Sequence, residues 1–123
     1  MILIFGGAYQ GKLDYAKANF RISRICDCQR AEEPDPGADC LCNTESFVMN
    51  CVKKGEEAKD WFVKNAEQLE NKIIIVTDVS QGVVPIDKDV RAFREMNGRL
   101  MVYLAEKADR VIRVFCGMGK DIK

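Results

Sequence analysis

The chain has 123 residues, with 19 basic and 19 acidic side chains that give a formal net charge of zero. A neutral chain has no extended basic field, so its composition argues against nucleic acid as a partner. The apolar runs are too short to cross a bilayer, and no basic residues precede a long apolar stretch as they would in a signal peptide. We therefore expect one cytoplasmic domain over residues 1–123.

The histidine and cysteine content limits the chemistry that this chain can use. Histidine is absent, which removes the commonest general base and excludes any mechanism through a phosphohistidine or a nucleotidyl-histidine. Six cysteines are present, and in a reducing cytosol we expect them to be thiols.

The first part of the chain begins with a strand and a helix. Residues 1–5 are continuously apolar, which is typical of a strand buried on both faces of a parallel sheet. A short helix is expected over residues 12–20. The segment "RISRICDCQ" allows a second strand, and "RAEEPDPGAD" is a charged loop with two prolines.

Two helices are expected in the middle of the chain. Thr44 is placed to cap the first helix, and Gly55 interrupts the helical pattern before the second. The apolar positions at helical spacing are Phe47, Val48, Cys51 and Val52 in the first, and Ala58, Trp61, Phe62, Ala66 and Leu69 in the second.

The last part of the chain alternates strands with a long helix. The run "KIIIVTD" predicts a buried strand that ends at Asp78, "SQGVVP" predicts a loop, and "RVIRVFC" predicts the last strand. Asp87 is a good cap for the long helix between them. The apolar face of that helix carries Val90, Phe93, Leu100, Met101, Leu104 and Ala108. This alternation predicts an α/β layered domain with a largely parallel central sheet.

The segment "GGAYQGK" at residues 6–12 matches the G-x-x-x-x-G-K core of a phosphate-binding loop, and it lies between a predicted strand and helix. Glycines permit a tight turn that points backbone N–H groups at phosphate oxygens, and the helix N-terminus adds partial positive charge. The motif predicts a P-loop NTPase-like fold that binds ATP or GTP with Mg²⁺; the alternative is a glycine-rich turn with a chance lysine. The residues expected to hold the nucleotide are Gly6, Gly7, Ala8, Tyr9, Gln10, Gly11, Lys12 and Leu13, with Lys12 on the outer phosphates.

Leu13 departs from the motif, because a Ser or Thr hydroxyl normally ligates Mg²⁺ at this position. Leucine cannot ligate a metal. Either the phosphates, water and carboxylates elsewhere hold the metal, or the site binds without turnover. The adjacent Asp14 is a carboxylate that could help to hold the metal, but we expect it to be first-turn helix charge, which is favourable against the helix dipole.

Asp78 is the second candidate for chemistry. It ends an apolar strand, which is the form of the signature in which an Asp orients Mg²⁺ or its water. Both motifs belong at the carboxyl edge of one parallel sheet, where open α/β sheets bind ligands. We therefore predict that Lys12 and Asp78 are catalytic and that Asp78 is linked to Mg²⁺. The alternative is that Asp78 only solvates a strand end.

Two segments carry a family resemblance: "MILIFGGAYQGK" at the start and "VTDVSQGVVPIDKDVRAFREMNGRLMVYLAEKADRVIRVFCGMGKDIK" at the end. They resemble the adenosylcobinamide kinase / adenosylcobinamide-phosphate guanylyltransferase family of cobalamin biosynthesis. That family has a Val-Val-Pro segment before an Arg-x-Phe-Arg helix with Gly-Arg further on. Here these are residues 83–85, 91–94 and 98–99. The likeness covers about the first 20 and last 50 residues, and the middle is shorter than in the family.

The resemblance implies a kinase that moves the γ-phosphoryl of ATP or GTP to the aminopropanol hydroxyl of adenosylcobinamide. In that family a histidine after the first helix accepts the guanylyl group; this chain has none, so we do not expect guanylyltransferase activity. Asp78 takes the place of the family's Glu, and Leu13 that of its usual Ser. A homotrimer is also implied.

The resemblance also implies that arginines on the long helix lie near the substrate. Arg91 and Arg94 are the candidates, and Arg99 follows on the same helix. The alternative is that they are solvated charges and ion pairs, since Arg91 and Glu95 are four residues apart.

Four cysteines form two Cys-x-Cys pairs around the proline-containing loop: Cys26, Cys28, Cys40 and Cys42. Four thiolates can bind zinc, but the usual spacing is Cys-x₂-Cys, so we expect small buried side chains rather than a zinc site. Cys51 and Cys116 are expected in the core.

Two functions are therefore compatible with the sequence. One is a kinase that acts on nucleotide and corrinoid small molecules. The other is a catalytically degenerate relative that holds a nucleotide or a corrinoid without turnover, which Leu13 favours. A zinc-stapled structural protein is a third, weaker interpretation.

Overall fold

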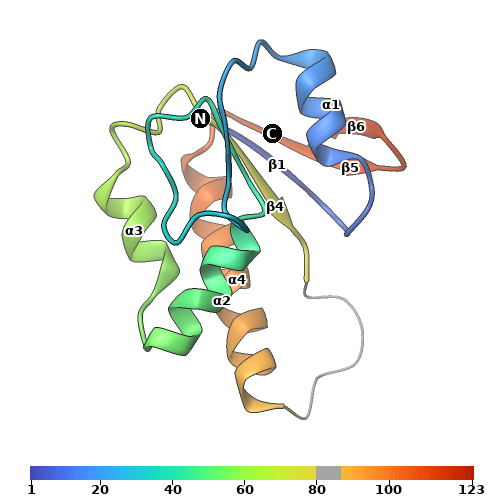
Figure 1. Ribbon diagram of the computed structural model, residues 1–123. Helices are drawn as coiled ribbons and strands as arrows, with labels where there is room; N and C mark the ends of the chain where they lie inside the picture. Colours follow the sequence, from blue (N-terminus) through green and yellow to red (C-terminus); the bar gives the residue numbers. More distant parts are fainter. Residues whose placement is uncertain (80–86) are drawn as a thin grey trace.

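The computed structural model describes residues 1–79 and 87–123, and within them a mixed sheet carries helices on both faces (Figure 1). The predicted loop "SQGVVP" lies outside the described residues. In the described part, no helix is long and apolar enough to cross a membrane. The elements are β1 (Ile2–Gly6), α1 (Lys12–Asn19), β2 (Ile25–Asp27), β3 (Cys40–Cys42), α2 (Thr44–Lys54), α3 (Ala58–Lys64), β4 (Ile73–Thr77), α4 (Lys88–Lys107), β5 (Arg110–Phe115) and β6 (Met118–Asp121).

The strand order is β2-β3-β4-β1-β5-β6, with β1 in the middle of the sheet. β1 pairs in parallel with β4 and β5, and β3 pairs in parallel with β2 and β4. Only β6, among the strands of the described residues, runs antiparallel to its neighbour. The predicted α/β fold with a largely parallel sheet is confirmed, and its layered arrangement is P-loop NTPase-like. The carboxyl ends of β1, β3, β4 and β5 consequently lie at one edge.

Two apolar layers hold the helices to the sheet. Successive side chains of a strand point to opposite faces, so Leu3 and Ile4 enter different layers. On one face α1 packs through Ala16 against Ile4 and Ile112. On the other face α2, α3 and α4 cover the sheet, as Figure 1 shows. The large, fully buried hydrophobic side chains of that layer are Leu3, Leu41, Val48, Phe62, Ile74, Val76, Leu100 and Leu104.

Two buried polar side chains fix helices to the carboxyl half of β4. Thr44 Oγ1 donates to the Ile75 carbonyl at 2.9 Å, and Asn97 Nδ2 donates to the Thr77 carbonyl at 3.0 Å. A buried hydroxyl or amide without a partner would be costly, so these bonds select one placement of α2 and α4. The start of α2 and the middle of α4 are thereby tied to the edge where β4 ends.

The expected cap at Thr44 is wrong by one residue. Asn43 occupies the N-cap position in a left-handed conformation (φ 52°) and makes no side-chain capping bond. Thr44 is instead the first helical residue, with its hydroxyl used on β4. Two expected core positions are also wrong: Ala66 lies beyond the end of α3 and is exposed, and Val90 is exposed in the first turn of α4.

The expected cap of the long helix is confirmed, because Asp87 accepts from the backbone N–H groups of Asp89 and Val90 at 2.9 and 3.1 Å. We expect Asp87→Ala to lower the free energy of unfolding by about 1 kcal/mol. Asp87→Asn keeps a capping acceptor and serves as the control. Urea denaturation of both variants measures the difference, and equal losses would contradict a capping role.

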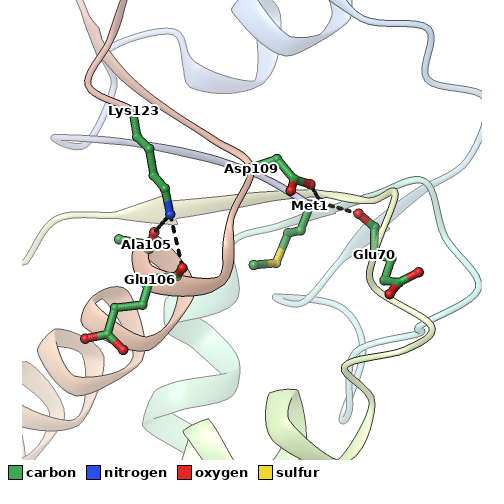
Figure 2. Close-up of polar contacts among 6 residues, drawn as sticks. All are labelled: Met1, Glu70, Ala105, Glu106, Asp109 and Lys123. Carbon is green, nitrogen blue, oxygen red and sulfur yellow. Dashed lines mark hydrogen bonds and ion pairs between the residues drawn. The ribbon is translucent and has the colours of Figure 1, made fainter.

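Contacts at the opposite edge of the sheet fasten the two ends of the chain (Figure 2). Lys123 Nζ donates to the carbonyls of Ala105 and Glu106 in the last turn of α4, at 3.1 Å each. A cation suits the negative end of the helix dipole. The amino group of Met1 pairs with Asp109 at 2.8 Å and donates to the Glu70 carbonyl. These contacts hold both ends of the chain at the edge of the sheet where the strands begin.

Candidate functional site

The loop at residues 6–12 connects the end of β1 to the start of α1 at the carboxyl edge. Gly11 adopts φ 84° at the N-cap of α1, a conformation that glycine adopts without strain. Lys12 is only 8% exposed, and its Nζ donates to the Gly7 carbonyl at 2.7 Å. The ammonium thus lies back across the loop that it follows.

Gly6 is required by a close approach to β5. A Cβ at this position would lie 2.3 Å from the Val114 backbone carbonyl oxygen. At Gly7 a Cβ would meet nothing closer than Gln10 Cγ at 3.6 Å, an ordinary contact. Gly6 is therefore needed for packing between central strands, and Gly7 is not.

Asp78 lies beside the start of the loop. Gly6 and Thr77 are opposite one another in the parallel ladder, and the Asp78 N–H donates to the Gly6 carbonyl at 2.8 Å. The two motifs that the sequence analysis singled out are therefore brought together, Lys12 from α1 and Asp78 from the end of β4. Their meeting follows from the adjacency of β1 and β4, which the sequence pattern alone does not specify.

Gln10 fastens the loop to the turn between β5 and β6, a contact that the sequence analysis missed. Its side-chain oxygen accepts from the Cys116 N–H at 2.7 Å, and its backbone carbonyl accepts from the Gly117 N–H at 2.8 Å. Both turn residues have positive φ, 50° at Cys116 and 76° at Gly117. Gly117, directly after the last predicted strand, was the signal for this turn.

Two opposing effects act on the pKa of Lys12. Burial lowers the pKa of Lys12, because desolvation disfavours the charged ammonium, and the negative charge of Glu45 raises it. Glu45 lies in the first turn of α2, just beyond the carboxyl end of β3. The sequence analysis did not single out this residue. Its position after a strand of the same sheet was the signal that could have found it.

Leu13 and Asp14 follow Lys12 on α1. Leu13 is half-buried and packs against the apolar layer beneath α1, while Asp14 is exposed in the first helical turn. Leu13 therefore anchors the helix to the sheet, a role that its apolar side chain explains. Asp14 is placed to favour the positive end of the helix dipole.

The candidate arginines lie on α4. Arg91 is exposed and Arg94 is half-buried, within the first two turns after the Asp87 cap. Arg99 lies further along and forms an ion pair with Glu57 at 2.9 Å, which joins α4 to the start of α3. Arg99 is thus placed in a structural contact away from the 6–12 loop.

The cysteine pairs lie on neighbouring strands, β2 and β3. In their parallel register Cys26 is opposite Leu41, and the Cys28 N–H donates to the Cys42 carbonyl at 3.0 Å. Within residues 1–79 and 87–123, no three His, Cys, Asp or Glu side chains come together as a metal site. Burial raises the pKa of Cys40 to about 12 and that of Cys42 to about 11. Uncharged thiols of this kind suit an apolar layer.

Cys116 does not lie in the core, as the sequence suggested, but is exposed in the turn after β5. We expect iodoacetamide to label Cys116 first in the native protein and to leave buried Cys40, Cys42 and Cys51 unmodified until denaturation. Peptide mass spectrometry over a time course measures the order. Cys116→Ser should remove the fastest labelling. Early modification of Cys40 would contradict this placement.

A cavity of about 630 Å³ lies between α3, α4 and the start of β1, with Phe62, Leu69, Tyr103 and Leu104 in its lining. It opens at the edge where the strands begin, opposite the 6–12 loop. Open α/β sheets bind ligands at the carboxyl ends of their strands, so the loop and Asp78 are the better candidate site.

A family model described as cobinamide kinase / cobinamide phosphate guanyltransferase matches residues 37–122. No curated protein matches the chain significantly. The matched range includes Asp78, Arg91 and Arg94 but begins after the 6–12 loop. The assignment of the loop therefore depends on its own sequence and geometry.

Proposed function

We propose that this chain, which belongs to the cobinamide kinase / cobinamide phosphate guanyltransferase family, is a kinase that phosphorylates adenosylcobinamide in cobalamin biosynthesis. ATP or GTP would bind with Mg²⁺ at the 6–12 loop, and the γ-phosphoryl would pass to the aminopropanol hydroxyl. The observation that carries the proposal is the meeting of the loop and Asp78, through the bond from Asp78 N–H to the Gly6 carbonyl at 2.8 Å.

The geometry of the loop fits a nucleotide phosphate. The turn ends at Gly11 with φ 84°, and no side chain caps the start of α1. The N-terminal N–H groups of that helix can therefore face an anion. The nearby ammonium of Lys12 is bound to a backbone carbonyl, a bond that phosphate oxygens can replace.

Phosphoryl transfer depends on positioning and charge neutralisation more than on covalent chemistry. Lys12 and the loop N–H groups would hold the phosphates in place. Asp78 would hold Mg²⁺ or orient the accepting hydroxyl. The substrate's hydroxyl oxygen would bond to the γ-phosphorus as the bond between that phosphorus and the β,γ-bridging oxygen breaks. The nucleoside diphosphate would leave, and the hydroxyl proton would pass to water. Mg²⁺, when bound, neutralises charge on the phosphates.

We further propose that guanylyl transfer through histidine does not take place on this chain, since it contains no histidine. Arg91 and Arg94 are proposed substrate contacts, because α4 begins beyond the edge where Asp78 lies. A single domain, a homotrimer and a cytoplasmic location complete the proposal; the trimer follows from the family resemblance.

Leu13 favours a second candidate function, a module that holds a nucleotide or a corrinoid without turnover. Its side chain packs into the apolar layer under α1 and leaves the usual metal-ligating hydroxyl absent. Asp78 also has a shorter side chain than the Glu that the family resemblance implies. Two departures at one metal site are the reason to test transfer separately from binding.

The test uses the purified chain with adenosylcobinamide, Mg²⁺ and either ATP or GTP labelled at the γ-phosphate. Label on the corrinoid supports the kinase. Nucleotide binding without transfer supports the degenerate module. Transfer from α-labelled GTP would overturn the exclusion of guanylyl transfer, and no binding of either nucleotide would overturn both candidates.

A further inference from the structure

Glu45 contains a buried polar atom that the fold leaves unsatisfied. Its side chain is half-buried, and its Oε2 atom is shielded from solvent with no hydrogen-bond donor among the described residues. A buried carboxylate oxygen without a partner costs folding free energy, so such an atom needs an explanation. Helix-dipole charge does not supply one, because an exposed carboxylate in the first turn of α2 would serve equally.

The position of Glu45 is fixed by its neighbours rather than left to a mobile loop. The preceding residue, Thr44, is fully buried and bonded to the Ile75 carbonyl of β4. The Ser46 N–H donates to the Asn43 carbonyl at 3.0 Å and closes the first turn of α2. Because β3 and β4 are adjacent, this turn lies at the same sheet edge as Asp78.

Glu45 also lies close enough to Lys12 for the charge of its carboxylate to raise the pKa of the ammonium. Lys12 begins α1, which follows β1, and Glu45 lies in the first turn of α2, which follows β3. In the sheet, β4 lies between β1 and β3. The ammonium and the carboxylate therefore lie within electrostatic range of one another, on either side of the strand that Asp78 follows. Three charged residues from three elements thus lie at one edge of the sheet, beside the 6–12 loop.

We propose that Glu45 is a Mg²⁺ ligand, directly or through a bound water, and that with Asp78 it replaces the hydroxyl missing at Leu13. This inference deepens the proposed function and rests on it. Mg²⁺ in phosphoryl-transfer sites is bound through one or two carboxylates plus the phosphates of the substrate. Such a metal arrives with the nucleotide, so one or two carboxylates of the chain are enough to complete its site.

The test measures the affinity for GTP and ATP by calorimetry with and without Mg²⁺, in wild type and Glu45→Gln. Glutamine keeps the size of the side chain and removes its charge. We expect Mg²⁺ to tighten binding to wild type, and this tightening to fall by about 10–100-fold in Glu45→Gln. Without Mg²⁺, Glu45→Gln should bind the nucleotide as tightly as wild type or more tightly, because a negative charge near the phosphates is gone.

Asp14→Asn is the matched control, since it removes an exposed carboxylate from the first turn of α1. It should keep the Mg²⁺ effect of the wild type. Electron paramagnetic resonance of Mn²⁺ with the nucleotide adds a readout of the metal itself, and Glu45→Asp should give an intermediate affinity. If Glu45→Gln keeps the full Mg²⁺ effect, the inference is wrong and the proposed function stands. If wild type binds neither nucleotide, both are wrong.

Discussion

Lys12→Ala should weaken the binding of ATP and GTP by about 30- to 700-fold. The ammonium would make charge-assisted hydrogen bonds to the outer phosphates, and losing them costs about 2–4 kcal/mol of binding free energy. The folded chain should tolerate the change. Lys12 is almost fully buried with a lowered pKa, so burial already opposes its charged form and removal relieves that cost.

Calorimetric titration of each nucleotide into wild type and Lys12→Ala measures the effect. Lys17→Ala is the matched control, because Lys17 lies on the same helix and is exposed in its last turn. It should bind like wild type, and both variants should unfold within a few degrees of wild type. Equal nucleotide affinity in Lys12→Ala and wild type would contradict the proposal that Lys12 in this loop binds the phosphates.

Gly6→Ala should destabilise the protein by about 1–3 kcal/mol or more, the usual range for overpacking a rigid site. The added Cβ would lie 2.3 Å from the Val114 carbonyl oxygen, and that atom belongs to the backbone of a central strand. β1 and β5 cannot move apart from one another without losing the backbone hydrogen bonds that pair them. The midpoint of thermal unfolding should fall by roughly 4–15 °C.

Gly7→Ala separates this effect from the general cost of replacing glycine. A Cβ there meets only Gln10 Cγ at 3.6 Å, so we expect its stability to stay within about 1 kcal/mol of wild type. Thermal unfolding followed by circular dichroism compares the two variants. A Gly6→Ala protein as stable as Gly7→Ala would mean that β5 is not held as closely to β1 as the structure shows.

Long apolar runs made the central strands and the longest helix predictable. β1, β4 and the start of β5 are nearly continuous in Ile, Leu and Val because helices cover both faces of the sheet there. The start of α4 was equally predictable, because Asp87 is a favoured N-cap residue, and the structure contains both of its capping bonds. These signals depend only on residues that are close together in the chain, so they can be recognised in a single sequence.

The elements that sequence reasoning missed lack local signals. β6 is exposed along its whole length and contains Gly119, Lys120 and Asp121, which do not favour strands; its pairing with β5 alone defines it. β3 has only three residues, and the Cys-x-Cys pattern drew attention to metal chemistry instead of to a buried strand. Asn43 and Thr44 are both favoured N-cap residues, and the sequence did not show that the chain places Asn43 at the cap in a left-handed conformation.

The candidate site was predictable in part. The rule that ligands bind at the carboxyl edge was enough to expect Lys12 and Asp78 in one place. The contacts of Glu45 and Gln10 could not be derived from the sequence, because they depend on which strands are neighbours. Glu45 needs β3 beside β4, and Gln10 needs the turn after β5 beside the loop.

The central position of β1 determines when the site can form during synthesis of the chain. β1 is translated first, yet both of its partners, β4 and β5, come from the second half of the chain. Contacts between residues so distant in sequence are slow to form, because a long loop must close before they contribute. The first strand therefore waits unpaired until residues 73–77 have left the ribosome, and it is paired on both sides only once residues 110–113 have followed. The 6–12 loop that follows β1 gains its contacts with Asp78, Cys116 and Gly117 only after those residues have emerged, so its folded geometry forms late in the synthesis of this domain.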